Sequence, residues 1–328
     1  MEMDLPAPYV ARSYRGLQDH RAMASILSDY HRYAGSSELL TAEQFDVTYA
    51  NLTNCDPATD IVVIEFGSEP VGYARSYWEQ REDDSRDYIL FSPMRPDHIH
   101  RPLFEALVAG QEAHLRPIAA GVANARFRAY APHPGPGVEP TNESAWLESL
   151  GYVAVRFGAC LVRSDLENIP ELPLPDGVEV RAVTPEMLRP IFEAHWEAFR
   201  GDWDFTEFAE EDFQRFVDDP FRDETMWKIA WAGEMVVGQV KSFINSQENT
   251  EMGYLRGYAE YISTHAEWRN LGIAGALLAA SLRELKARGM TDAALGVETS
   301  NPGGAFHLYT KLGFELRAYE AAYAKPLT

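Results

Sequence analysis

The sequence predicts an α/β or α+β layer sandwich that occurs twice along the chain. Its 328 residues exceed the size of most single domains and fit two domains of about 150 residues each. The same order of expected strands and helices recurs at a spacing of about 165 residues, which is typical of a duplication. Between the copies, residues 164–178 contain three prolines in a polar, acidic setting, as a linker does. We therefore expect domains over 1–164 and 177–328, joined by a linker over 165–176.

Each copy begins with the same two groups of secondary-structure elements. The first is a short strand, a turn and a helix with apolar residues at helical spacing, expected over 9–27 and 178–194. The second is a hairpin with glycine in its turn, expected over 60–77 and 226–243.

Each copy then continues with a strand and a long amphipathic helix, expected over 88–115 and 258–289. A last helix ends in Leu-Gly-aromatic, at 150–152 and 312–314, where glycine stops the helix and the aromatic residue starts a strand. Hairpins combined with strand–helix–strand units predict a sheet covered by helices in each copy.

Composition and charge limit the classes of function. A formal net charge of −21 argues against nucleic-acid binding, because phosphate backbones attract basic surfaces, and suits a cationic substrate instead. The first residues lack the basic and apolar stretches of a signal peptide, so none is expected, and the longest apolar stretch, 273–282, is much shorter than a bilayer-spanning helix. Two cysteines are too few for a disulfide framework, and His98 and His100 have no third ligand at metal-site spacing. We expect a cytoplasmic protein without a membrane partner or a metal.

The start of the second long helix is a candidate phosphate site. Residues 267–282 read EWRNLGIAGALLAASL, with Gly272 and Ala274 at the helix entrance. A strand that turns into a helix through small residues leaves backbone N–H groups unpaired at the positive end of the helix dipole, where an anion binds. Small side chains let phosphate oxygens approach these amides, and Arg269 adds a guanidinium. The alternative is that Gly272 only allows the helix to pack closely on the strand.

Together with residues 295–315, this segment resembles the GNAT superfamily of acyl-CoA-dependent N-acetyltransferases. The acetyl-CoA loop of that family has the form Arg/Gln-x-x-Gly-x-Gly/Ala, and residues 269–274 read RNLGIA. The family's later motif has an Asn, a small residue and a Tyr shortly before Gly-Phe, which are here Asn301, Ala305, Tyr309, Gly313 and Phe314. The resemblance covers the second half and the outline of the first. It implies two tandem GNAT-like domains, each with a mixed, mostly antiparallel sheet flanked by helices.

The resemblance further implies that acetyl-CoA binds in the second half. Backbone amides of the loop would hold the pyrophosphate, and the strand that ends at Thr264 would part from its neighbour and pair with the pantetheine arm. The implied cofactor-binding residues are Ile262, Thr264, Arg269, Asn270, Leu271, Gly272, Ile273, Ala274 and Asn301.

The same resemblance suggests the catalytic residues. Tyr309 would lie near the sulfur and protonate the departing thiolate. Because an amine must lose a proton before it attacks, Glu260 is expected as the base or as a residue that positions the amine, on the same strand face as Thr264. Glu298 on the next strand and a water relay are alternative bases, and a structural salt bridge is the alternative role for either carboxylate. Both cysteines lie in the first half, so we expect direct transfer in a ternary complex.

The first half departs from the family pattern. It has Arg101, Pro102 and Leu103 where the loop stands in the second half, and Pro102 offers no N–H to a phosphate. Leu147 takes the place of Tyr309. We expect the first domain to keep the fold without the cofactor site.

The acceptor is left open by the sequence. Residues 195–224 interleave acidic and aromatic side chains, which suits a cationic amine and equally suits an amphipathic helix pair with an aromatic core. Mycothiol synthases are tandem members with a similar layout, and aminoglycosides, polyamines and protein N-termini are further candidates. We expect an N-acetyltransferase that acts on a small-molecule primary amine, as a monomer or homodimer. The alternatives are a non-catalytic acyl-CoA sensor or interaction protein, and transfer to oxygen or of a longer acyl chain.

Overall fold

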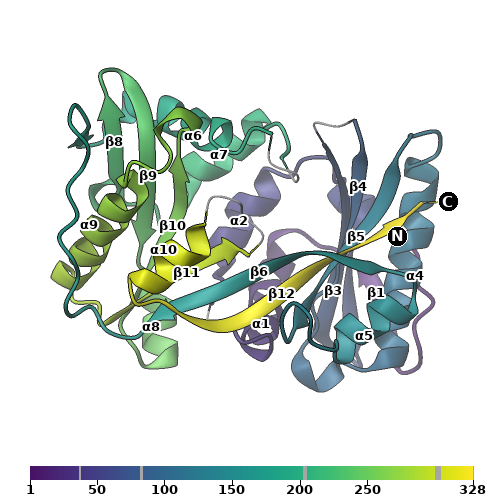
Figure 1. Ribbon diagram of the computed structural model, residues 1–328. Coiled ribbons are helices and arrows are strands. Elements are labelled where there is room, and N and C mark those ends of the chain that lie inside the picture. Colours follow the sequence, from purple (N-terminus) through teal and green to yellow (C-terminus); the bar gives the residue numbers. More distant parts are fainter. Residues whose placement is uncertain (37, 82–83, 202–204, 300–303, 328) are drawn as a thin grey trace. The chain divides into compact units, whose positions relative to one another are not determined.

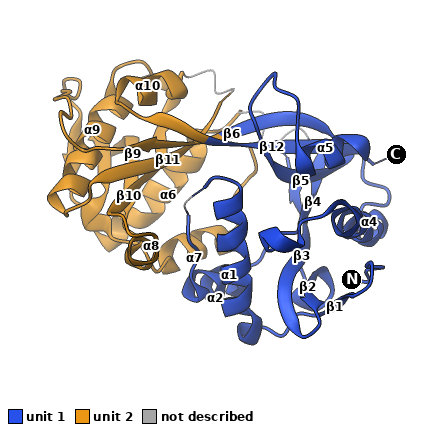
Figure 2. Cartoon of the chain, turned by 90° about the horizontal axis from the view of Figure 1, so that it is seen from below, with its two compact units in different colours: residues 1–158, 318–328 blue, residues 159–317 orange. Residues whose placement is uncertain are grey.

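The chain divides into two units of dense internal contacts, shown in two colours in Figure 2. Unit 1 comprises Met1–Gly158 and Ala318–Thr328, and unit 2 comprises Ala159–Arg317. The computed structural model describes residues 1–36, 38–81, 84–201, 205–299 and 304–327. The segment expected as a linker, 165–176, lies inside unit 2, and the end of the chain belongs to unit 1.

Unit 1 contains a mixed sheet with helices. Its strands are β1 (Tyr9–Ser13), β2 (Ile61–Phe66), β3 (Glu69–Gln80), β4 (Arg86–Phe91), β5 (Ala125–His133), the first part of β6 (Val153–Arg163) and the last part of β12 (Glu315–Pro326). Its helices are α1 (Leu17–Tyr33), α2 (Ala42–Ala50), α3 (Pro57–Asp60), the 3₁₀ turn η1 (Pro96–His98), α4 (Arg101–Ile118) and α5 (Asn142–Ser149). The strand order is β1-β2-β3-β4-β5-β12, and β4–β5 is a parallel pair among antiparallel neighbours.

Helices cover both faces of this sheet, as the continuous apolar run of β2 requires. Ile61 and Val63 pack in one cluster with residues of α1, whereas Val62 and Ile64 pack in another with residues of α4. Successive side chains of a strand point to opposite faces, so a strand that is apolar at every position is buried on both sides.

Unit 2 repeats the plan. Its strands are the end of β6 (Val153–Arg163), β7 (Glu179–Arg181), β8 (Lys228–Ala232), β9 (Met235–Phe243), β10 (Arg256–Thr264) and β11 (Asp292–Glu298). Its helices are η2 (Pro185–Met187), α6 (Leu188–Glu197), α7 (Glu210–Asp218), η3 (Glu224–Met226), α8 (Ser246–Met252), η4 (Ala266–Trp268), α9 (Ile273–Ala287) and α10 (Ala305–Lys311). The strand order is β6-β11-β10-β9-β8-β7, with β10–β11 parallel.

In unit 2, α9 covers one face of the sheet and α6 covers the other (Figure 1). A Cβ added to Gly238 of β9 would lie 2.5 Å from Cγ2 of Ile273, and α9 can therefore rest directly on this strand. On the opposite face, the next residue, Gln239, donates a hydrogen bond from Nε2 to the carbonyl oxygen of Ile191 in α6 at 3.1 Å.

The last helix of each unit ends in the same hydrogen-bond pattern. The N–H of Tyr152 donates to the carbonyl of Leu147 at 3.1 Å, and the N–H of Phe314 donates to that of Tyr309 at 3.0 Å. A glycine with positive φ precedes the aromatic residue in both, as in a left-handed helix stop. Leu147 therefore takes the place in unit 1 that Tyr309 has in unit 2.

The layered fold and the order of its elements agree with the sequence prediction, including both hairpins and both long helices. Over the described ranges, the structure has no helix with the length and apolar character needed to cross a membrane.

Candidate active site

The parallel strands β10 and β11 part soon after they begin. Among the residues that the structure describes, they pair from Arg256 opposite Asp292 to Tyr258 opposite Ala294, although β10 continues to Thr264. Past this point the strands no longer pair residue by residue. A strand edge without a neighbour is a place where an extended ligand can add as a strand.

A β-bulge lies in β10 at the same level. Glu260 is opposite Lys241 of β9 and Ser263 is opposite Gln239, so that Tyr261 and Ile262 together face a single residue. Tyr261 has a φ of 50°, which an L-residue adopts only under local constraint. Such a bulge turns side chains away from the regular alternation.

The bulge corrects one sequence prediction. Glu260 and Thr264 were expected on one face, as in a regular strand. Thr264 is instead opposite Gly238, which faces α9, whereas Glu260 is opposite Lys241 on the other face. The inserted residue shifts the alternation by one position.

Glu260 and Tyr309, the two expected catalytic residues, lie close enough to influence each other electrostatically. The backbone N–H of Gly296 in β11 donates to Oε1 of Glu260 at 3.0 Å, across the point where the strands part. Tyr309 of α10 is 5% exposed, and burial raises its pKa, with the charge of Glu260 adding to the effect. The phenol therefore keeps its proton at neutral pH, as a general acid must.

Arg163 of β6 holds the end of α10 and was not found from the sequence. Its Nη1 donates to the carbonyl oxygen of Leu312 at 2.6 Å, and the residue is 7% exposed. A buried cation at a helix C-terminus satisfies a carbonyl and the helix dipole, and here it fixes the helix that carries Tyr309.

The start of α9 is open. Gly272 is the N-cap residue with a φ of 84° and no side-chain cap, and a Cβ built on it would meet no atom within 4 Å. The alternative that Gly272 lets the helix pack closely on the strand is therefore wrong. The glycine that allows this close packing is Gly238 of β9. The N–H groups of Ile273, Ala274 and Gly275 are the first-turn donors that an α-helix cannot satisfy internally.

Unit 1 closes the corresponding position with its own side chain. His100 is the N-cap residue of α4, and its Nδ1 accepts a hydrogen bond from the N–H of Leu103 at 3.4 Å. His98 and His100 both hydrogen-bond to the hydroxyl of Tyr9 at 3.1 Å. These histidines thus have structural partners within unit 1.

Other expected cofactor residues are placed as follows. Arg269 donates to the backbone carbonyls of Ala198 and Thr264, which joins the loop to the end of α6. Asn270 has a positive φ of 63°, and Leu271 is 53% exposed. Asn301 lies outside the described residues.

A buried lysine and a histidine near the bulge were missed by the sequence analysis. Lys241 is 3% exposed, and its ammonium lies 4.5 Å from the ring centroid of Phe216 and 4.8 Å from that of Tyr261. Burial lowers its pKa to about 7. Burial and the charge of Lys241 lower the pKa of His195 to about 3, so that the imidazole is neutral. The available signal was a lysine within the apolar strand sequence VVGQVKSF.

The aromatic residues of the expected acceptor region pack mainly on one another. Phe192 lies 6.0 Å from Trp196, 5.1 Å from Phe208 and 5.4 Å from Phe216, between ring centroids. The interpretation as an amphipathic helix pair with an aromatic core therefore fits α6 and α7. Trp203 lies outside the described residues.

Cys55 is not a candidate nucleophile. Burial raises the pKa of Cys55 to about 12, so it is a thiol rather than a nucleophilic thiolate at neutral pH. Among the residues that the structure describes, no cluster of three or more His, Cys, Asp or Glu side chains could hold a metal ion.

Unit 2 thus combines parted parallel strands with an uncapped helix start. Residues 188–314 match the model of the acetyltransferase (GNAT) family. Over these residues the chain is thus similar to the GNAT acetyltransferases, a family whose activity is acyl-CoA-dependent acetyl transfer. No curated protein sequence matches the chain.

Solved structures share the fold over the whole chain. A GCN5-related N-acetyltransferase from Sphaerobacter thermophilus has 20% identity and a TM-score of 0.70, covering 98% of this chain and 96% of that one. A tandem GNAT protein from the clavulanic acid biosynthesis pathway has 14% identity and a TM-score of 0.66, covering 97% and 98%. The N-myristoyltransferase of Saccharomyces cerevisiae has 14% identity and a TM-score of 0.60, covering 98% and 79%. The tandem GNAT fold expected from the sequence is therefore confirmed.

Proposed function

We propose that unit 2 transfers the acetyl group of acetyl-CoA to a primary amine while both substrates are bound. The observation that carries the proposal is the pair of Glu260 and Tyr309 beside the parted ends of β10 and β11. Unit 1 keeps the fold without this constellation, since Leu147 replaces Tyr309 and His100 caps α4.

The cofactor-binding part of the proposal uses the backbone of the loop. The backbone amides between Arg269 and Ala274 hold the pyrophosphate. The positive φ of Gly272 and its lack of a side chain support this assignment. The edge of β10 at Ile262 and Thr264 pairs with the pantetheine arm, because β11 no longer occupies it. We retain Asn301 as a further contact to that arm.

The chemical part assigns one proton to each catalytic residue. Acetyl-CoA supplies an activated thioester. Glu260 accepts a proton from the ammonium, directly or through water, and the neutral amine attacks the carbonyl carbon. As the C–N bond forms and the C–S bond breaks, Tyr309 donates its phenolic proton to the departing thiolate. Glu298, at the end of β11, is the alternative base.

Acetyl-CoA titration of a matched glycine pair tests the cofactor site. Gly272 and Gly289 flank α9 with φ of 84° and 87°, and a Cβ at either meets no atom within 4 Å. Gly272→Glu places a carboxylate at the anion site, whereas Gly289→Glu adds the same charge and backbone strain at the far end of the helix. Calorimetry should find one site per chain that only Gly272→Glu abolishes. Two sites would contradict the assignment of unit 1, and absence of binding would exclude acetyl transfer.

Thiol release with a panel of amines tests the catalytic assignments. Tyr309→Phe should lower kcat by about 10²–10⁴-fold, as for loss of a general acid, with acetyl-CoA affinity retained. Glu260→Gln and Glu298→Gln compare the two carboxylates, and the base is the one whose loss removes the acidic limb of the pH–rate profile. A protein that binds acetyl-CoA but releases no thiol with any amine would be the non-catalytic sensor instead.

A further inference from the structure

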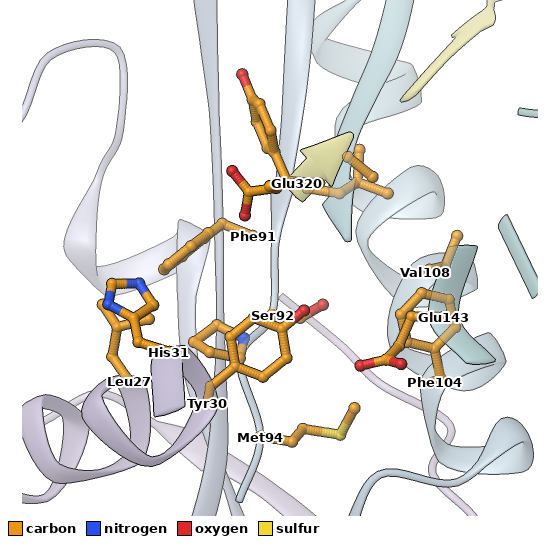
Figure 3. Close-up of a pocket in the computed structure, with 14 residues that line it drawn as sticks. Leu27, Tyr30, His31, Phe91, Ser92, Met94, Phe104, Val108, Glu143 and Glu320 are labelled. Carbon is orange, nitrogen blue, oxygen red and sulfur yellow. The ribbon is translucent and has the colours of Figure 1, made fainter. Parts of the chain in front are cut away.

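Unit 1 contains a pocket where its own parallel strands part. The pairing of β4 with β5 ends at Leu90 opposite Ala129, and the pocket lies beyond this pair, between α1 and α4 (Figure 3). Its volume of about 40 Å³ has room for a few water-sized groups. The pocket thus lies at the topological position that holds the proposed cofactor site in unit 2, but it is much too small for a coenzyme.

Two carboxylates line the pocket, those of Glu143 in α5 and Glu320 in β12. Glu143 is 2% exposed, and its Oε2 accepts a hydrogen bond from the hydroxyl of Tyr33 at 3.0 Å. Its Oε1 is buried and has no hydrogen-bond partner in the structure. Within the described ranges, no arginine or lysine forms an ion pair with either glutamate. A buried carboxylate oxygen without a donor is costly, so a ligand that donates hydrogen bonds and carries positive charge would be stabilising here.

Burial and the helix dipole act in opposite directions on the charge of Glu143. Burial raises its pKa and that of Glu320, the latter to about 7, so that part of the Glu320 population is ionised at neutral pH. Glu143 also lies in the first turn of α5, where the helix dipole stabilises negative charge.

The aromatic side chains that line the pocket favour an organic cation over a metal ion. Tyr30, Phe91 and Phe104 line the pocket with the two carboxylates, and aromatic faces attract organic ammonium groups. A metal ion would need more ligands than these, and the described residues contain no cluster of three or more metal-ligating side chains.

The duplication gives an independent reason for a change of ligand. Glu143 stands four residues before Leu147, and in α10 the residue four before Tyr309 is Ala305. The small residue of unit 2 is thus replaced by a carboxylate in unit 1. A negative charge at this place repels a phosphate-bearing cofactor and attracts a cation.

We propose that unit 1 binds the ammonium group of a primary alkylamine in this pocket, with Glu143 and Glu320 as acceptors and the aromatic rings as walls. The site binds without catalysing a reaction, and it does not depend on the proposed function of unit 2.

Titration of the full chain with methylammonium chloride at pH 8 tests the site, with sodium chloride at equal ionic strength as the reference. Glu143→Gln should weaken binding by about 10-fold or more, since charge-assisted hydrogen bonds contribute at least that much. Glu148→Gln is the matched control, because Glu148 is an exposed residue of the same helix. Glu260→Gln should leave this binding unchanged, which separates it from binding of an acceptor amine in unit 2.

Glu320→Gln provides a second variant, and thermal melting of each protein shows whether it is folded. The wild-type protein should melt at a higher temperature in methylammonium than in sodium, and this difference should be lost in both pocket variants. Equal affinity of Glu143→Gln and Glu148→Gln, weakening by Glu260→Gln alone, or no binding to the wild-type protein would each overturn the proposal.

Discussion

Lys241 illustrates how a single residue can couple stability to pH. Its buried ammonium contacts the rings of Phe216, Tyr261 and Trp227, and burial lowers its pKa to about 7 from the ordinary 10.5. Between these values the unfolded chain binds more protons than the folded one, so wild-type stability rises with pH. Below pH 7 both states are protonated, and the cost of the buried charge is fully present.

Lys241→Met should therefore stabilise the protein by about 1–4 kcal/mol at pH 6, and by less at pH 9. Urea unfolding at the two pH values measures the difference. Lys228→Met is the control, because Lys228 forms an ion pair with Glu284 at 3.1 Å. An equal gain from Lys241→Met at both pH values would contradict the predicted coupling.

At this scale the sequence predicts residues whose chemistry belongs to a local motif. The loop around Gly272 and the Tyr309 motif could be proposed from the sequence because their spacing is fixed along the chain. Arg163 and Lys241 were not found, because each gains its role from elements distant in sequence. The bulge at Tyr261 was missed because one inserted residue leaves no mark on the composition of a strand.

Among the elements, α9 links packing to the proposed cofactor site. Its contact with β9 depends on Gly238, where an added Cβ would lie 2.5 Å from Cγ2 of Ile273. Gly238→Ala should displace the start of α9 and destabilise the protein by about 1–3 kcal/mol. Acetyl-CoA binding should weaken as well, since the displaced turn carries the free N–H groups.

Gly275→Ala is the matched control for Gly238→Ala. A Cβ at Gly275 would lie 3.4 Å from side-chain atoms of Leu172 and Leu308, which is an ordinary contact distance. This variant should be as stable as the wild-type protein or more so. Thermal unfolding and acetyl-CoA titration of both variants check the contrast, and equal destabilisation would show that α9 tolerates no added methyl group at all.

The order of the elements was predictable because periodicity and turn residues repeat in both halves. The partners of the strands were not, since a period of two identifies a strand without naming its neighbour. The sequence therefore predicted a boundary near the proline-rich segment, but it did not predict that the end of β12 belongs to unit 1. Nor did it show that residues 165–176 pack in unit 2, where Arg283 of α9 donates to the carbonyl oxygen of Pro170 at 2.8 Å.

For the whole molecule, this return of the chain means that unit 1 is completed only by the last residues. Eight residues at the end of β12 pair with β5, from Tyr319 opposite His133 to Pro326 opposite Arg126, and Ala321 and Tyr323 are completely buried.

A chain that ends after Arg317 would expose one edge of β5 and remove these side chains from the core of unit 1. It should therefore lose the cooperative unfolding of unit 1 and aggregate through the open edge. A chain that ends after Leu327 keeps all of β12 and should unfold like the wild-type protein, as circular dichroism and light scattering can establish. An intact, monodisperse truncated protein would show that unit 1 folds without β12.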